Sequence, residues 1–140
     1  MKQKVEASLA SPAESFRAAV KVEFPDFCNR LPAEAVGDWN DPNLYLCANM
    51  FAEFINKSIQ RGEMSVVERA YSVLERLLTT SDTSAELFNA VCVGVIEHLE
   101  FNSSPHGATA QRRMPPALRK EWLALEQYWK HLGAERQRSR

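Results

Sequence analysis

Apolar residues return at the spacing of an α-helix along most of this chain. Between residues 64 and 79, Val67, Ala70, Leu74 and Leu77 share one face, and charged side chains occupy the opposite face. No segment alternates with the period of two that strands require. The pattern predicts an all-α fold with about five main helices. The expected helices span residues 11–22, 42–61, 64–79, 84–101 and 115–132.

Capping residues predict where several of these helices begin and end. Ser11 is followed by proline and, three positions later, by Glu14, which together make a capping box. Asp41 precedes another proline and is expected to cap the second helix. Gly62 and Gly133 are expected to end the second and the last helix. The turns expected between consecutive helices are short, for example residues 62–63 and 80–83. Short turns make neighbouring helices antiparallel, which predicts a single compact bundle or a short stack of helical hairpins.

The remaining segments are expected to be irregular parts of one domain covering residues 1–140. Residues 23–41 contain two prolines and four large apolar residues that are expected to tuck the connection against the core, namely Phe24, Phe27, Leu31 and Trp39. Residues 102–114 are polar and contain proline and glycine, which predicts a surface loop. Residues 1–10 and 134–140 are expected to be frayed ends.

Composition suits an ordinary globular protein of the cytoplasm. Of the 140 residues, 45% are hydrophobic and 25% are charged, and no apolar run approaches the length of a membrane span. Cys28, Cys47 and Cys92 are odd in number and far apart, so we interpret them as buried thiols in a reducing compartment. Charge is uneven: residues 1–101 hold 9 basic and 15 acidic residues, whereas residues 102–140 hold 8 and 3.

The sequence lacks the motifs of nucleotide binding, metal binding and hydrolysis. The cluster of Glu97, His98 and Glu100 could supply an acid and a base in a cleft, but helical angles direct the two glutamates and the histidine to different sides. We expect His98 to be a buried, hydrogen-bonded histidine. No enzymatic activity, metal site or cofactor is therefore predicted.

The outer face of the fourth expected helix is the candidate site for a protein partner. Glu86, Glu97 and Glu100 project there around Asn89 and an exposed Val93, an apolar centre with an acidic rim that suits a basic partner. Glu53 on the second helix is expected to join this surface. The alternative interpretation is an ordinary solvated helix face, and Leu46, Met50 and Phe54 on the second helix are interpreted as core.

Basic residues are concentrated in the last third of the chain, which raises the possibility of nucleic-acid binding. They are Arg112, Arg113, Arg119, Lys120, Lys130, Arg136, Arg138 and Arg140. The acidic first hundred residues would repel phosphate over most of the surface. Trp122 and Trp129 lie on the apolar stripe of the last helix and are expected to be core anchors, so nucleic-acid binding is disfavoured.

Several stretches together resemble a bacterial family of small helical domains without an assigned function. They are Leu44-Tyr45 with Phe51 and Phe54, Val73–Leu77, Val93–Leu99, and Met114–Arg119 with Trp122, Leu125 and Tyr128-Trp129. The family pattern has Gly-Pro where this chain has Met-Pro-Pro at residues 114–116. Between residues 44 and 130 the order and spacing of these stretches fit the family, which implies a helical fold.

The same resemblance implies a function by analogy. Short helical proteins of this kind often serve as immunity proteins, which bind a cognate bacterial toxin and block it. The leading hypothesis is therefore an immunity protein directed against a toxin domain that acts in the cytoplasm. The second hypothesis is a non-catalytic helical adaptor or regulatory subunit, and the third is a weak nucleic-acid binder. A toxin-like reading frame beside the gene would favour the first.

Overall fold

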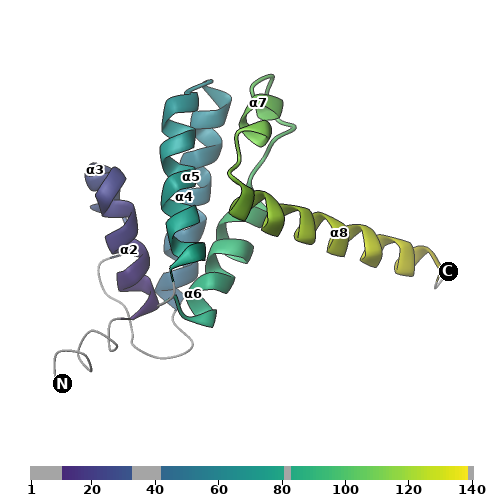
Figure 1. Ribbon diagram of the computed structural model, residues 1–140, viewed down its shortest axis with the longest axis horizontal. Helices are drawn as coiled ribbons and strands as arrows, with labels where there is room; N and C mark the ends of the chain where they lie inside the picture. The colour runs from purple at the N-terminus through teal and green to yellow at the C-terminus, as the bar shows by residue number, and fades with distance from the viewer. Residues whose placement is uncertain (1–10, 33–41, 81–82, 139–140) are drawn as a thin grey trace.

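The computed structural model describes residues 11–32, 42–80 and 83–138, and in these ranges all regular structure is helical (Figure 1). The all-α prediction is therefore confirmed. In chain order the elements are α2 (Pro12–Glu23), α3 (Pro25–Cys28), α4 (Pro42–Gln60), α5 (Met64–Thr79), α6 (Ala85–Asn89), η1 (Ala90–Val95), η2 (Ile96–His98), α7 (Gly107–Arg112) and α8 (Pro116–Arg138).

Helix α2 begins as predicted for the helix expected at residues 11–22. The backbone N–H of Glu14 donates to the hydroxyl of Ser11 at 3.1 Å, and the N–H of Ser11 donates to the carboxylate of Glu14 at 3.2 Å. Phe24 interrupts the helix with φ −134°, and Pro25 starts α3 directly afterwards. Phe24, Phe27 and Leu31 are buried, as predicted, whereas Trp39 and Asp41 lie outside the described residues.

Helices α4 and α5 form an antiparallel hairpin at the centre of the bundle (Figure 1). Gly62 turns the chain with φ 72°, in the left-handed region that glycine adopts without strain, so the predicted stop is confirmed. Helix α4 buries Leu44, Phe51 and Ile55 among others, and its second flank divides: Met50 and Phe54 pack against the core, whereas Leu46 is 49% exposed. The prediction that Leu46 belongs to the core is therefore wrong.

The expected fourth helix, residues 84–101, is not a continuous α-helix. Ser84 caps α6, and the chain then widens into the π-helix η1 and tightens into the 3₁₀ turn η2, which ends at His98. Helix η1 packs so closely along α4 that a Cβ atom on Gly94 would lie 2.6 Å from the Cβ of Ala48. The close contact explains why glycine occupies this position, which sequence inspection had not singled out.

Residues 102–114 are not a structureless surface loop, which corrects the prediction. They contain α7, and Gly107, Ala110 and Met114 are buried. A Cβ atom on Gly107 would lie 1.7 Å from the carbonyl oxygen of Phe101, so the chain reversal requires glycine at this position. The hydroxyl of Tyr71 on α5 donates to the carbonyl of Ala110 and fixes α7 to the bundle.

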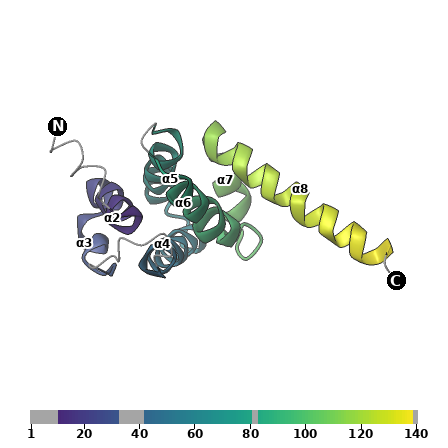
Figure 2. The ribbon, with the colours of Figure 1, turned by 90° about the horizontal axis from the view of Figure 1, so that it is seen from below.

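The last helix, α8, begins as predicted at the proline pair but does not end at Gly133. Its bounds are Pro116–Arg138, so the predicted stop at Gly133 is wrong. Glycine inside a helix costs about 1 kcal/mol, which neighbouring turns of good helix formers outweigh. From its first turns on the bundle, α8 projects away from the other helices (Figures 1 and 2).

The core of the described residues is continuous across α2, α3, α4, α5 and the α6–η1–η2 segment. Its centre is aromatic: the ring of Phe51 contacts those of Phe16, Phe24 and Phe27 at centroid distances of 5.9–6.1 Å. The three cysteines are buried, as predicted, and none of them forms a disulfide. No helix in the described part of the chain combines the length and the apolar character that crossing a membrane needs.

Candidate partner-binding site

Helix α8 is anchored to the bundle by its first half. Leu118 is fully buried, and the indole of Trp122 meets the ring of Phe101 edge-on at 5.8 Å. The guanidinium of Arg119 donates to the carbonyl of Arg112 at 2.7 Å. It thereby supplies a hydrogen-bond donor to one of the carbonyl groups at the C-terminal end of α7. Contacts to α5 and η2 complete this anchor. The direction in which α8 leaves the bundle is therefore set by its first two turns.

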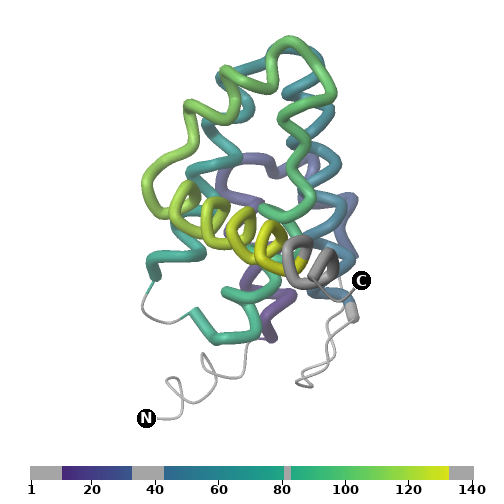
Figure 3. Tube along the Cα trace, turned by 90° about the vertical axis from the view of Figure 1, so that its right-hand side faces the viewer, coloured from purple at the N-terminus to yellow at the C-terminus, as the bar shows by residue number. Residues whose placement is uncertain are grey.

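Beyond Leu125 the apolar stripe of α8 runs off the bundle. Trp129 is 50% exposed and Tyr128 56% exposed, and their rings contact each other edge-on at 5.5 Å. Leu123 on a neighbouring face is 45% exposed. The prediction that Trp129 is a core anchor is therefore wrong. Helix α8 leaves the other helices and points toward the viewer in Figure 3.

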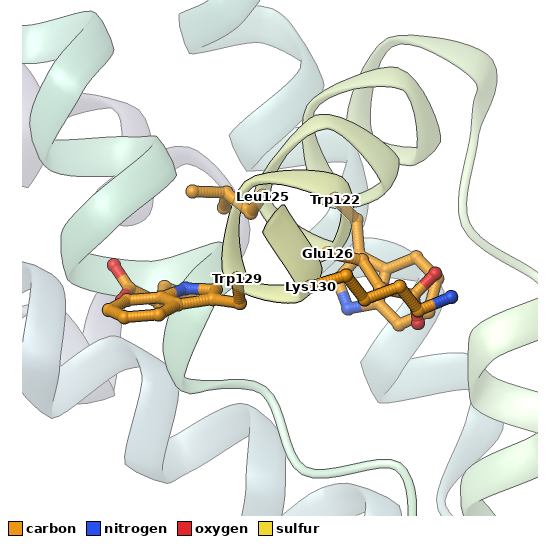
Figure 4. Close-up of a pocket in the computed structure, with 6 residues that line it drawn as sticks. Trp122, Leu125, Glu126, Trp129 and Lys130 are labelled. Atoms are coloured by element: carbon orange, nitrogen blue, oxygen red, sulfur yellow. The ribbon is translucent and has the colours of Figure 1, made fainter. Parts of the chain in front are cut away.

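A hollow of about 380 Å³ lies where α8 meets the end of η2. It is lined by Glu97, Trp122, Leu125, Glu126, Trp129 and Lys130. Leu125 lies between the two tryptophans, with Trp129 on one side of the helix and Trp122, Glu126 and Lys130 on the other (Figure 4). This surface, here called the α8 hollow, offers large apolar groups beside two carboxylates and one ammonium group.

The structure divides the six residues predicted to bind a partner. Glu97 lines the α8 hollow, whereas Glu53 and Glu100 line a different hollow of about 320 Å³, which is formed mainly by α4 with His98 at the end of η2. Asn89 and Val93 are exposed, Val93 by 37%, on the outer face of α6 and η1. Glu86 is half-buried. The six residues therefore do not form one acidic stripe.

The predicted stripe fails because it assumed 100° per residue throughout. A π-helix turns less per residue and a 3₁₀ helix turns more, so side-chain directions along η1 and η2 do not follow 100° per residue. The helix also ends at His98, and Leu99 is extended with ψ 134°, which places Glu100 outside the helix. The apolar periodicity of residues 84–101 signals neither change.

Neighbouring side chains hold two of the predicted residues in place. Asn89 donates to the hydroxyl of Tyr45 at 2.7 Å, and Glu53 pairs with Lys57 at 3.2 Å. Asn56, which sequence analysis missed, donates to the carbonyl of His98 at 2.9 Å and accepts from the N–H of Glu100 at 2.9 Å. It therefore fixes the end of η2 and, with it, the position of Glu97 beside α8.

The titratable groups of this region do not assemble a reactive constellation. His98 is exposed, which corrects the prediction of a buried histidine. Burial, and then the nearby carboxylate of Glu121, raise the pKa of Cys92 from 9.0 to about 12, so the thiol is neutral at physiological pH. Within the described ranges no three histidine, cysteine or acidic side chains are placed to hold a metal ion.

Several basic residues of the last third have structural partners. Arg113 pairs with Glu68 of α5, Arg112 donates to the hydroxyl of Thr109 at 3.3 Å, and Arg119 is held by the end of α7. Arg113 links the end of α7 to α5, Arg119 links α8 to the end of α7, and the bond of Arg112 lies within α7. These guanidinium groups are therefore only partly available to an anionic partner.

Comparison with known proteins identifies a family but no individual relative. No curated protein and no solved structure matches the chain. Residues 17–130, from the second turn of α2 to the exposed end of α8, match the family described as Domain of unknown function (DUF7674). The match includes every residue that lines the α8 hollow. The chain belongs to this family of domains of unknown function.

Proposed function

We propose that this chain is a non-catalytic protein-binding domain that acts as an immunity protein, and that its toxin partner docks in the α8 hollow. The observation that carries the proposal is the exposed pair of Tyr128 and Trp129 on the part of α8 that projects from the bundle. Large apolar side chains half exposed to water cost hydration free energy that a partner would recover. Tryptophan and tyrosine are the residues that most often anchor protein interfaces.

The shape of the region also favours a protein partner. A helix that leaves the bundle presents several successive turns, and η2 supplies a second wall beside it. A partner segment that binds between α8 and η2 would contact Trp122, Leu125 and Trp129 of α8 on one side and Glu97 of η2 on the other. An apolar centre with a charged rim is the usual arrangement of a protein interface.

Charge would direct the approach of a basic partner. Glu97 and Glu126 provide two carboxylates against the single ammonium group of Lys130. Opposite charge raises association rates from about 10⁵–10⁶ to about 10⁸–10⁹ M⁻¹s⁻¹ at low salt. Fast capture suits an inhibitor that must bind its toxin before the toxin acts.

Growth protection tests the proposal directly. The toxin-like reading frame beside the gene is expressed with the chain in a sensitive host, and wild type is expected to restore growth. Trp129→Ala should abolish protection, because it removes the central anchor. Val22→Ala on α2 is the matched control, since Val22 is also an exposed apolar residue, 64% exposed, and lies far from α8 in the chain.

Two outcomes would count against the proposal. Full protection by Trp129→Ala would exclude the α8 hollow as the binding surface. The lack of any toxin-like neighbour, combined with binding of another cellular protein that Trp129→Ala weakens, would favour the adaptor or regulatory subunit instead. Both functions use the same surface, and the identity of the partner separates them.

Charge reversal separates the two hollows that hold the predicted glutamates. Glu97→Lys should slow toxin association at low salt and have little effect at high salt. The reason is that exposed charges steer association by long-range attraction, which salt screens. Glu100→Lys is the control, since Glu100 lines the other hollow. Equal effects of the two variants would indicate that the interface lies on the outer face of η2 and not in the α8 hollow. Thermal unfolding of both variants should match wild type.

A further inference from the structure

A groove of about 400 Å³ lies between α3, α4 and α5, apart from the α8 hollow. Four basic residues line it, Arg30, Lys57, Arg61 and Arg69, against the two acidic residues Glu53 and Glu63. Residues 1–101 as a whole hold 9 basic and 15 acidic residues. Nearly half of the basic groups in an acidic part of the chain therefore gather at one groove, which favours an anionic ligand.

The floor of this groove, here called the cationic groove, is apolar and aromatic. The rings of Phe27 and Phe54 are stacked at 4.6 Å with an interplanar angle of 30°. Phe54, Met50 and Val66 remain partly exposed and line the groove. A flat apolar group can therefore lie on the floor and contact ring, thioether and aliphatic surface together.

The arginines differ in how far they are already engaged. Arg69 stacks over the ring of Phe24 at 4.7 Å and pairs with Glu23 at 3.2 Å, and Lys57 pairs with Glu53. Arg30 stacks over Phe27 at 5.0 Å. In the described residues neither Arg30 nor Arg61 forms an ion pair. A guanidinium that stacks by its face keeps its N–H edge for a carboxylate.

We propose that the cationic groove binds a carboxylate carried by an aromatic ring. The ring lies on Phe54 and Met50, and the carboxylate accepts hydrogen bonds from Arg30 and Arg61 at the rim. Two sources share this chemistry: a free small aromatic acid, and the C-terminus of a peptide that ends in an aromatic residue. The groove lies away from the α8 hollow, so this site is independent of the toxin-binding proposal.

Three probes with the same ring system and different charges test the site. They are indole-3-acetate, indole-3-acetamide and tryptamine, which are an anion, a neutral molecule and a cation. Indole-3-acetate should bind about tenfold more tightly than the amide, because each charge-assisted hydrogen bond outweighs a neutral one. Tryptamine should bind more weakly than both. Equal affinity of the three probes would overturn the proposal.

Methionine methyl resonances locate the bound probe. In the full chain labelled at methionine methyl groups, indole-3-acetate should shift the signal of Met50, which lines the groove. Met114 is buried at the foot of α8 and serves as the internal reference. A shift of Met114 with no shift of Met50 would place the probe elsewhere and overturn the proposal.

Single variants identify the cationic partners. Arg30→Gln and Arg61→Gln should each weaken indole-3-acetate about tenfold and leave indole-3-acetamide unchanged, because each removes one charged donor. Arg76→Gln is the matched control, since Arg76 is an exposed arginine of α5 outside the groove. Arg30→Lys should recover part of the affinity. If both Gln variants bind indole-3-acetate with full affinity, the carboxylate does not bind to Arg30 and Arg61, and the proposal is overturned.

A peptide probe distinguishes the two sources. N-acetyl-glycyl-tryptophan with a free C-terminus is compared with its C-terminal amide. Tighter binding of the free acid than of indole-3-acetate identifies a peptide C-terminus, and the reverse identifies a small acid. Failure of both carboxylates to bind would overturn the proposal, and circular dichroism of each variant confirms that the comparison concerns folded protein.

Discussion

The hydroxyl of Tyr71 donates a 2.7 Å hydrogen bond to the backbone carbonyl of Ala110, 39 residues further along the chain. Tyr71 is 1% exposed, and burial raises the pKa of its hydroxyl well above the ordinary value. The bond joins the central hairpin to α7, from which α8 continues. It therefore helps to determine the direction in which the candidate binding helix projects.

Removing this hydroxyl should destabilise the protein without unfolding it. Tyr71→Phe keeps the ring and removes the shorter of two hydrogen bonds to the carbonyl of Ala110, which also accepts from the backbone N–H of Arg113 at 3.2 Å. The free energy of unfolding should therefore fall by about 0.5–1.5 kcal/mol. Urea denaturation measures the change. Tyr128→Phe is the control, because Tyr128 is 56% exposed, and its stability should match wild type. Equal stability of both variants would mean that the Tyr71 bond contributes nothing.

The close contact of η1 with α4 predicts a rescue. Gly94→Ala would place its methyl group 2.6 Å from the Cβ of Ala48, and relief of this overlap should cost about 1–3 kcal/mol of stability. Ala48→Gly removes the opposing methyl group, so the double variant should be more stable than the sum of the two single changes predicts. Strict additivity in thermal or urea unfolding would contradict this contact.

Cys92 should make stability depend on alkaline pH. Its pKa rises from 9.0 to about 12 on folding, so the unfolded chain loses the thiol proton first as pH increases. The free energy of unfolding should therefore fall between about pH 9 and pH 12. Cys92→Ala should show a shallower fall than wild type. Rapid alkylation of Cys92 by iodoacetamide at pH 8, followed by mass spectrometry, would contradict a buried neutral thiol.

The two tryptophans of α8 should differ in their effects. Trp122→Ala should lower the free energy of unfolding by about 2–3 kcal/mol, because its ring packs against Phe101 in the bundle. Trp129→Ala should change stability by less than about 1 kcal/mol, since half of the side chain is exposed. The sequence predicted that both tryptophans are core anchors, which would make the two losses similar. A large loss for Trp129→Ala in urea unfolding would show that the exposed end of α8 packs on the bundle.

The amino-acid sequence by itself determined the helical class and most helix boundaries. The capping box at Ser11, the stop at Gly62 and the continuous apolar face of residues 64–79 are local features, and each appears where it was predicted. Local patterns succeed here because a cap or an amphipathic face acts within one or two turns. The burial of the cysteines follows from their apolar neighbours in the same way.

The tertiary structure decided how far each helix continues and which residues meet. The contact between Gly94 and Ala48 accompanies a π-helix, and the bond from Tyr71 to Ala110 orders residues that the sequence assigned to a loop. The two contacts join residues that are 46 and 39 positions apart, and helical periodicity carries no information over such separations. The apolar stripe of α8 was visible in the sequence, but its end is exposed because the bundle reaches only its first turns. Whether such a stripe becomes core or binding surface depends on what lies opposite, and only the folded arrangement supplies that information.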